Sequence, residues 1–392
     1  MKKIGVIGAG AMGRGIAQVA ATAGKQVIVY DASAASLEQA KTYFTSTFAK
    51  LVEKNKMTEV EAQAIMASIS YASSLADFAS ADLIIEAIIE QLDIKQKVFT
   101  ELEHYVSDTC VLASNTSSLS ISSIAAACKQ PGRVFGIHFF NPAALMPLVE
   151  VIPGISSDAE LTPVLKKQIE SWKKIPVIAK DTPGFIVNRV ARPFYGEAIR
   201  IWEERWEGLP GGEVGFATID WAMRELGGFK MGPFELMDLI GHDVNYRVTE
   251  TVWQQFFCDP RYKPSLTQKR LFEAGRYGKK TGQGYYNYSK PMPEPVKDFV
   301  LANKIFMRVL SMLINEAVDA LYLDVASRDD IDLAMTKGVN YPKGLLKWAD
   351  EIGLDKVLAQ LQSLYDEYAE DRYRPSVLLK KQVRENRTFY TI

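Results

Sequence analysis

The fold is decided by the stretch KIGVIGAGAMG at residues 3–13. Residues 3–7 predict a short buried strand, and the glycines after it open a helical pattern that Gly24 ends. A second strand is predicted over residues 26–30, and an acidic residue, Asp31, comes directly after it. The order of strand, glycine-rich turn, helix, strand and carboxylate is typical of a dinucleotide-binding α/β unit.

Each glycine of this turn has a physical use. Gly8 permits the tight turn, Gly10 lets the backbone approach a pyrophosphate, and Gly13 lets the helix pack closely on the strand. The phosphates would then lie on the free amides of the helix N-terminus. A carboxylate at Asp31 can accept hydrogen bonds from ribose hydroxyls but would repel a 2′-phosphate, so NAD is predicted rather than NADP. The predicted NAD-binding residues are Gly8, Ala9, Gly10, Ala11, Met12, Gly13 and Asp31; a purely structural turn is the other interpretation.

Further apolar runs predict that the sheet continues. Strands are expected over residues 82–85, 110–113, 133–137 and 148–152. Residues 34–68 carry two amphipathic helical patterns that break near residues 55–58, which predicts an inserted helical hairpin. The lysines of this hairpin suit a phosphate-bearing substrate or, equally, belong to a solvated helix face. They are Lys41, Lys50, Lys54 and Lys56.

The composition restricts the classes of partner. The chain has 392 residues, with 46 basic and 47 acidic side chains and a formal net charge of −1. This balance gives no bulk attraction to nucleic acid or to a membrane, so an anionic ligand must be held by a local site. The three cysteines, Cys110, Cys128 and Cys258, are scattered, which argues against a metal site and for a reducing, cytoplasmic compartment. Glycines and Arg14 interrupt the N-terminal apolar run, and no run reaches the roughly 18 residues of a membrane span, so neither a signal peptide nor a span is expected.

One of the three histidines is placed for catalysis. His104 lies near a helix end and His242 in an expected turn, whereas His138 follows the predicted strand 133–137. The carboxyl end of a parallel strand borders the ligand crevice in this fold class, and imidazole titrates near neutrality, so His138 is the candidate general base. Glu150 lies in the apolar strand LVEVI, where a buried charge needs a partner. His138 is the natural partner, and an edge strand facing water is the other interpretation of Glu150.

Several motifs together resemble the L-3-hydroxyacyl-CoA dehydrogenase family. One is the run SNTSS at residues 114–118, which offers short donors at the same crevice, although such a run alone is more often a turn or a helix cap. The others are the turn Gly8–Gly13, Asp31, HFFNP at 138–142, Glu150, DTPGFIVNR at 181–189, GPFE at 232–235 and KKTGQGYY at 279–286. They follow the family's order over roughly residues 3–288, and the combination is highly specific.

The resemblance implies a reaction and a role for individual residues. The reaction is the NAD-dependent oxidation of (3S)-3-hydroxyacyl-CoA to 3-oxoacyl-CoA, as in fatty-acid β-oxidation. His138 would be the general acid and base with Glu150 as its partner, and Ser117 and Asn188 would bind the reacting oxygen. Further NAD contacts are implied for Glu90, Lys95, Ser117, Asn141 and Lys280. Contacts to the CoA substrate are implied for Ser117, Lys54 and Thr47, which keeps the hydroxyl of the serine that the family has there.

The second half of the sequence is predicted to be helical and internally repeated. Ile219-Asp220, Gly232, Asp238 and Asp243 recur 112 positions later as Ile331-Asp332, Gly344, Asp350 and Asp355. The expected fold is an α/β Rossmann domain at residues 1–184, followed by an all-α domain. That domain would consist of two tandem copies of a helical unit resembling the 6-phosphogluconate dehydrogenase C-terminal domain. The copies are placed at residues 185–288 and 296–392, and residues 185–206 are expected to form one long helix.

The second copy is expected to be structural, because Met307 stands where the first copy has Asn188. The resemblance implies that members of the family with a single copy form homodimers joined through this helical domain. A second copy in the same chain could fill that interface internally. The chain is therefore expected to be either a homodimer or a monomer with the interface filled.

Substrate length is less well defined by the sequence. The run NRVARPFYGE at residues 188–197 departs from the commoner family pattern, which is apolar where Arg192 stands. It resembles the branch of phenylacetate degradation that acts on 3-hydroxyadipyl-CoA, and Arg192 could pair with the distal carboxylate. Alternatively, Arg192 is a surface residue or packs on Tyr195 or Phe194, and the simpler substrate is 3-hydroxybutyryl-CoA.

Two other classes of function remain as alternatives. A non-catalytic NAD-binding protein on the same fold would not need Ser117, His138, Glu150 and Asn188 together. An oxidoreductase acting on a hydroxy acid without CoA would not need the lysines of the hairpin. The sequence therefore favours a dehydrogenase that acts on an acyl-CoA.

Overall fold

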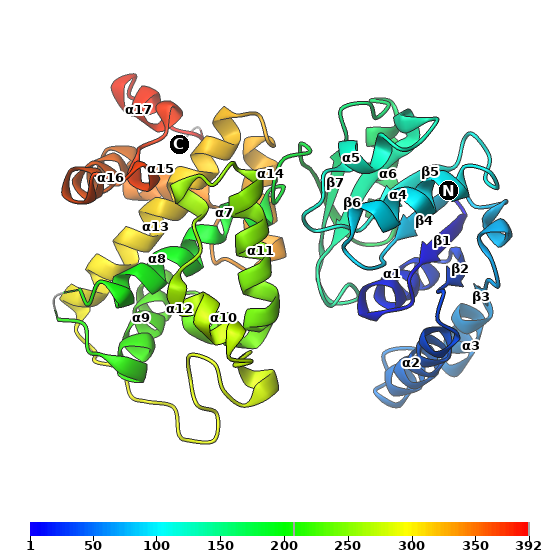
Figure 1. Cartoon of the computed structure of the whole chain (residues 1–392), viewed down its shortest axis with the longest axis horizontal. Coiled ribbons are helices and arrows are strands. Elements are labelled where there is room, and N and C mark those ends of the chain that lie inside the picture. The colour runs from blue at the N-terminus through cyan, green and yellow to red at the C-terminus, as the bar shows by residue number, and fades with distance from the viewer. Residues whose placement is uncertain (207, 391–392) are drawn as a thin grey trace. The chain divides into compact units, whose positions relative to one another are not determined.

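The computed structural model describes residues 1–206 and 208–390. The chain divides into two compact units, Met1–Phe185 and Ile186–Ile392 (Figure 1). The first unit is a sheet with helices, and the second unit is helical.

The first unit is built on an eight-stranded sheet with the order β3-β2-β1-β4-β5-β6-β7-β8. Neighbouring strands are parallel except for β6 and β7, which are antiparallel. The strand order reverses between β1 and β4, which is the switch point where such sheets bind ligands beyond the carboxyl ends of their strands. The strands are β1 (Lys3–Ile7), β2 (Gln26–Tyr30), β3 (Ile69–Tyr71), β4 (Leu83–Glu86), β5 (Val111–Ser114), β6 (Val134–Phe139), β7 (Leu148–Pro153) and β8 (Ile175–Ile178).

The strands predicted from the sequence are confirmed to within two residues at each end, but β3 and β8 were not predicted. The first has only three residues, too few for a pattern to be recognised. The second contains Pro176, which argues against a strand in a sequence because proline cannot donate to the ladder. In the structure β8 is the outermost strand, where this missing donor is tolerated.

The helices of the first unit cover the sheet and form the predicted hairpin. The hairpin consists of α2 and α3 and lies beside β2 and β3 (Figure 1). It bends where predicted, because Thr58 and Glu61 form a capping box that starts α3. Phe44 and Phe48 of α2 are buried in the core of this unit. The helices are α1 (Ala11–Thr22), α2 (Ala34–Glu53), α3 (Glu59–Ala67), α4 (Leu92–Leu102), α5 (Ile121–Ala125) and α6 (Leu161–Ser171).

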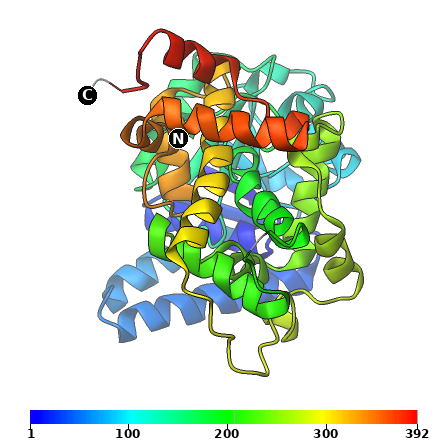
Figure 2. The same cartoon turned by 90° about the vertical axis from the view of Figure 1, so that its left-hand side faces the viewer.

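The second unit packs around the long helix α13, which contacts α8, α9, α15, α16 and α17 (Figure 2). The single helix predicted over residues 185–206 is wrong, because the structure has two helices that meet at Ala191. Pro193 lies in the first turn of the second helix, where its missing N–H costs nothing, whereas inside a continuous helix it would break a hydrogen bond. The helices are α7 (Val187–Val190), α8 (Arg192–Glu203), α9 (Gly212–Gly227), α10 (Pro233–Ile240), α11 (His242–Gln255), α12 (Leu266–Glu273), α13 (Phe299–Tyr322), α14 (Arg328–Gly338), α15 (Leu345–Ile352), α16 (Leu354–Tyr368) and α17 (Val377–Arg384).

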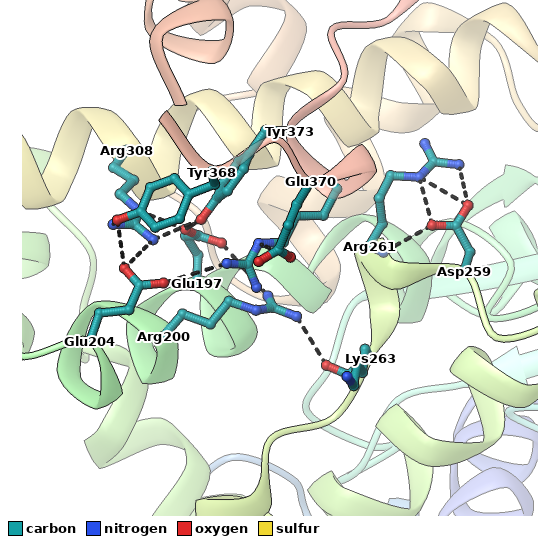
Figure 3. A network of polar contacts seen from close by, with 11 residues as sticks. Glu197, Arg200, Glu204, Asp259, Arg261, Lys263, Arg308, Tyr368, Glu370 and Tyr373 are labelled. Carbon is teal, nitrogen blue, oxygen red and sulfur yellow. Dashed lines mark hydrogen bonds and ion pairs between the residues drawn. The ribbon is translucent and has the colours of Figure 1, made fainter. Parts of the chain in front are cut away.

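Two buried ion pairs join α7 and α8 to α13 in a reciprocal way. Arg189 Nε donates to Glu316 Oε1 at 2.6 Å, and Arg308 Nε donates to Glu197 Oε1 at 2.6 Å. A tyrosine hydroxyl also donates to each carboxylate, from Tyr262 to Glu316 and from Tyr373 to Glu197. Figure 3 shows the ion pair between Glu197 and Arg308 together with Tyr373.

Two buried aspartates hold helix N-termini in the same manner. Asp220 accepts hydrogen bonds from two backbone amides at the start of α10, at 2.8 and 2.9 Å. Asp332 accepts the equivalent pair at the start of α15, at 2.8 and 3.0 Å. In each case a tyrosine hydroxyl, of Tyr286 or of Tyr390, donates to the same carboxylate.

Within the described residues, no helix combines the length and the apolar character needed to cross a bilayer.

Candidate active site

The pairing of β6 with β7 places His138 directly opposite Glu150. The distance between His138 Nδ1 and Glu150 Oε2 is 2.7 Å, the Glu150 carboxylate is fully buried, and His138 is 6% exposed. An ionised carboxylate only accepts, so Nδ1 carries the proton and Nε2 is left as the basic nitrogen. Because β7 lies between β6 and β8, the interpretation of Glu150 as a water-facing edge residue is wrong.

Aromatic rings surround the imidazole of His138. The centroid of the Phe140 ring lies 4.5 Å from that of the imidazole, and the Phe185 ring lies 6.0 Å away. Asn115, at the end of β5, accepts a hydrogen bond from the backbone N–H of Phe139 at 2.8 Å. The imidazole is therefore held by a carboxylate and flanked by two rings, and the strand that carries it is bonded to the side chain of Asn115.

The serine-rich run that contains Ser117 is held by Glu90. The Glu90 carboxylate accepts hydrogen bonds from the Thr116 hydroxyl, the Ser117 backbone N–H at 3.0 Å and the Ser118 hydroxyl at 3.1 Å. Burial acts to raise the pKa of Glu90, but the charge of Lys95 and these hydrogen bonds outweigh it, so the pKa lies below its usual value. Glu90 and Ser117, two predicted site residues, are thus in direct contact.

Glu86 is a buried residue of this site that the sequence analysis missed. It ends β4, is fully buried, and accepts hydrogen bonds from Lys95 Nζ at 2.6 Å and from the Ser114 hydroxyl at 2.7 Å. Lys95 Nζ also lies 3.3 Å from Glu90. Lys95 therefore links two carboxylates beneath the serine-rich run. An acidic residue directly after the apolar run DLII was the signal that could have identified Glu86, as it did for Asp31.

The glycine-rich turn fits the pyrophosphate of NAD. A side chain at Gly8 would lie 2.5 Å from the Ala87 carbonyl oxygen, and one at Gly13 would lie 1.7 Å from the Gly8 carbonyl oxygen. Gly10 alone of the three faces open space, as the approach of a phosphate requires. Gly10 is also the N-cap of α1 and supplies no side-chain cap, so the amides at this end are open to an anion.

Asp31 has a structural role in addition to the ribose contact that the sequence predicts. One carboxylate oxygen accepts a hydrogen bond from the backbone N–H of Ala9 at 2.8 Å, and the other accepts from Ser33 N–H at 2.8 Å. The residue therefore holds the glycine-rich turn in place. A carboxylate has further lone pairs, so these bonds leave capacity for ribose hydroxyls.

The hairpin residues predicted to meet CoA lie along one side of α2. Thr47 and Lys54 are separated by two helical turns, and Lys50 lies between them on the same face. Lys50 and Lys54 are exposed and form no ion pair within the described residues, whereas Lys41 pairs with Glu38 at 2.6 Å. Two of the four hairpin lysines are thus aligned with Thr47.

Three further predicted residues are described within their own units. Asn141 is exposed in the connection between β6 and β7 of the first unit. In the second unit, Asn188 is half-buried on α7. Lys280 Nζ lies 2.5 Å from Asp243, a contact within the second unit.

Arg192 on α8 is buried at 7% exposure and is not the surface residue that one interpretation suggested. Its Nη1 donates to the Thr249 hydroxyl at 3.0 Å, and the guanidinium lies 5.0 Å from the centre of the Tyr195 ring. Its Nε atom is buried without a hydrogen-bond partner, and no carboxylate pairs with it within the described residues. Burial lowers the pKa of Arg192. A buried guanidinium in this state costs free energy unless an anion is supplied.

His242 forms a second buried pair with a carboxylate, in the second unit. His242 is fully buried, and its Nε2 lies 2.8 Å from Asp238 Oδ1. It is the first residue of α11 and does not lie in the expected turn. The described residues contain no group of histidine, cysteine and acidic side chains that could hold a metal ion.

The chain matches models of one protein family over most of its length. Residues 3–182 match the 3-hydroxyacyl-CoA dehydrogenase NAD binding domain. The C-terminal domain of the same family matches twice, at residues 184–288 and at residues 305–389.

Similar proteins carry related names. The chain is 37% identical to 3-hydroxyadipyl-CoA dehydrogenase of Escherichia coli (strain K12), covering 97% of each chain. It is 39% identical to a probable 3-hydroxybutyryl-CoA dehydrogenase of Deinococcus radiodurans, over 73% of this chain and 100% of that protein. A crystal structure of 3-hydroxybutyryl-CoA dehydrogenase from Escherichia coli K12 is similar with a TM-score of 0.92 and 36% identity, covering 98% of each chain.

Proposed function

Because the chain belongs to the 3-hydroxyacyl-CoA dehydrogenase family, we propose that its substrate is a short-chain (3S)-3-hydroxyacyl-CoA such as 3-hydroxybutyryl-CoA. The protein is an NAD-dependent dehydrogenase that oxidises 3-hydroxyacyl-CoA. The observation that carries the proposed mechanism is the buried hydrogen bond between His138 and Glu150.

In this mechanism Glu150 keeps the proton of His138 on Nδ1, so that Nε2 can take the proton of the substrate's C3 hydroxyl. The imidazolium that forms is stabilised by the buried carboxylate 2.7 Å away. Ser117 and Asn188 bind the C3 oxygen and orient it toward the base. Bound NAD supplies the acceptor for the hydride that leaves C3.

The proposed NAD site uses the whole carboxyl edge of the sheet. The open amides of α1 and the space at Gly10 receive the pyrophosphate, and Asp31 receives the ribose. Glu90 and Lys95 shape the serine-rich run that borders the site. Asn141 and Lys280 complete the set of proposed cofactor contacts.

The proposed CoA site uses the hydroxyl of Thr47 and the ammonium of Lys54. Their alignment on one face of α2 supports this assignment, because a local cluster of cations is what a nearly neutral protein needs to hold a phosphorylated substrate. We expect Lys54→Ala to raise KM for acetoacetyl-CoA about threefold to tenfold, as the loss of one charge-assisted contact would. Lys167→Ala, which removes an exposed lysine of α6, is the control.

A spectrophotometric assay of NADH oxidation tests the function. Acetoacetyl-CoA should be reduced efficiently, and free acetoacetate should not, because it lacks the CoA group that the hairpin binds. Equal rates with the two compounds would favour an oxidoreductase for free hydroxy acids. No turnover of either compound, with NADH still bound, would favour the non-catalytic alternative.

The unpaired Arg192 favours a second candidate substrate, 3-hydroxyadipyl-CoA. Its distal carboxylate would supply the anion that the buried guanidinium lacks. The relative from Escherichia coli that covers 97% of the chain carries the name of this activity. The test compares kcat/KM for hydroxyadipyl-CoA and hydroxybutyryl-CoA in the wild type and in Arg192→Met. A selective loss with the dicarboxylic substrate supports this candidate, and an equal loss with both removes it.

We also propose that the helical unit consists of two copies of one fold, at residues 185–288 and 296–392. Four features support this. The reciprocal Arg–Glu pairs have the form of a two-fold interface, in which each partner contributes both groups. Asp220 and Asp332, 112 positions apart, cap equivalent helices. The C-terminal family domain matches the chain twice. The relative from Deinococcus radiodurans is fully covered by only 73% of this chain.

The proposed consequence is that the second copy occupies the place that a partner subunit takes in single-copy relatives. The full chain should then be a monomer, because both halves of that interface are already buried against each other. Size-exclusion chromatography with light scattering at micromolar concentration tests this. A stable homodimer would mean that the chain has another interface.

A further inference from the structure

Phe185, the last residue of the first unit, has an unusual backbone conformation. Its φ is +48°, and that of the preceding Gly184 is +73°. Glycine adopts this left-handed region readily, but a bulky residue there is a genuine outlier. Such a conformation persists only where the surroundings impose it, and it is found mainly at functional sites.

The segment before Phe185 is tied down strongly enough to impose this conformation. Asp181 accepts four hydrogen bonds from the start of α5: from the hydroxyl of Ser120 at 3.0 Å, the backbone N–H of Ile121 at 2.9 Å, and the backbone N–H and hydroxyl of Ser122 at 2.7 and 2.6 Å. The backbone N–H of Phe185 closes a turn onto the Thr182 carbonyl at 2.9 Å. The path of the chain is thus fixed on its N-terminal side.

The result of this path is a contact with the catalytic base. The Phe185 side chain is 1% exposed, and its ring centroid lies 6.0 Å from that of the His138 imidazole at an interplanar angle of 55°. Phe140 provides a second ring at 4.5 Å and 51°. Glu150 fixes the position of Nδ1, but one hydrogen bond still lets the plane of the ring tilt through small changes in its two side-chain torsions. Packing against the two rings restricts that tilt.

We propose that Phe185 is a positioning residue for His138: its strained backbone keeps the ring against the imidazole, which aims Nε2 and excludes water from the base. This inference rests on the proposed role of His138. The inference gives a role to the segment DTPGF at residues 181–185. Asp181, its first residue, anchors it to α5, and Phe185 contacts the base. An apolar side chain without a ring would fill part of the space but would leave the imidazole free to tilt.

The test replaces Phe185 by leucine in the full-length chain. We expect kcat with acetoacetyl-CoA to fall roughly 10-fold to 100-fold, because small misplacements of a reacting group reduce rates by this order. KM and the Kd for NADH should change less than about threefold, because the residues proposed to bind both molecules are intact. Phe185→Met, which is flexible and fills irregular space, makes the same test if the leucine variant does not fold.

Phe99→Leu is the matched control. Phe99 of α4 is also 1% exposed and lies in the core of the first unit, and no contact between it and His138 is found in the described residues. This variant should lower the midpoint of thermal unfolding to a similar extent while kcat stays within about twofold. The proposal is overturned if Phe185→Leu and Phe185→Met keep a wild-type kcat, or if kcat falls equally in Phe99→Leu. If replacing His138 by glutamine leaves kcat unchanged, it is the proposed function that fails, whatever the Phe185 variants show.

Discussion

The protein contains two buried histidine–carboxylate pairs with almost the same geometry. His138 and Glu150 are 2.7 Å apart in the first unit, and His242 and Asp238 are 2.8 Å apart in the second. Both carboxylates are fully buried. His138 retains 6% exposure, whereas His242 has none and its Nδ1 is buried without a partner. The short hydrogen bond therefore does not by itself distinguish a catalytic pair from a structural one.

The difference lies in what else each carboxylate binds. Asp238 also accepts hydrogen bonds from the backbone of Tyr285 and Tyr286 and from the Tyr288 hydroxyl, so it holds a chain segment. Asp350 accepts a similar pair of backbone bonds, from Phe389 and Tyr390, and in the proposed duplication Leu354 is the counterpart of His242. The second pair thus belongs to a set of hydrogen bonds that holds the backbone of residues 285–288. The first pair lies at the carboxyl end of β6, where one imidazole nitrogen remains available to a ligand.

The largest effect should come from His138→Gln. Glutamine keeps polar atoms at the site but cannot act as a base near neutral pH, so kcat should fall by about 10²-fold or more. NADH binding, followed by fluorescence, should be retained because the turn at Gly8–Gly13 is untouched. A near-normal rate would remove His138 from the mechanism and make the two pairs equivalent.

A smaller effect is expected for Glu150→Gln. The amide oxygen can still accept the hydrogen bond from Nδ1, but the negative charge that stabilises the imidazolium is lost, so kcat should fall by roughly 10-fold to 100-fold. The Glu150 side chain is fully buried, so folding must be checked by circular dichroism. Retention of more than half of the wild-type kcat would show that Glu150 only orients the imidazole.

Asp238→Asn should change stability and leave catalysis intact. An amide nitrogen would face backbone donors of the segment at Tyr285, so the free energy of unfolding should fall by about 1–3 kcal/mol. The kcat of the folded fraction should stay within about twofold of wild type. Urea unfolding and initial rates, measured on the same preparation, report the free energy of unfolding and kcat separately. Asp350→Asn is the matched control, because Asp350 also accepts hydrogen bonds from two backbone amides. A loss of kcat without loss of stability would give the second pair a catalytic role.

The contrast between the pairs also shows what the sequence could predict. The glycine-rich turn, six of the eight strands and the pairing of His138 with Glu150 were predictable because they depend on local pattern and on a charge within an apolar strand. The fully buried position of His242 was not predicted. Its partner Asp238 lies only four residues away, but the burial of the pair and the contact of the imidazole with the Tyr285 ring depend on packing within the second unit. The ion pairs of Lys95 with Glu86 and Glu90 were not predicted either, because they depend on how the chain turns after the end of β4. The left-handed backbone of Phe185 has no sequence signal, since it is imposed by hydrogen bonds to Asp181 from another helix.

The smallest effect is expected for His242→Leu. In the proposed duplication this change gives the first copy the residue type that the second copy has at Leu354. Asp238 would keep its three bonds from the segment 285–288, and the leucine would remove the buried Nδ1 that has no partner. The loss of one hydrogen bond and the removal of one unsatisfied polar atom act in opposite directions, so the free energy of unfolding should change by less than about 1 kcal/mol. We expect kcat and KM to be unchanged. A fall in the kcat of His242→Leu as large as that expected for His138→Gln would contradict this comparison. The two pairs would then not differ in their access to a ligand, and His242 would have to take part in the reaction.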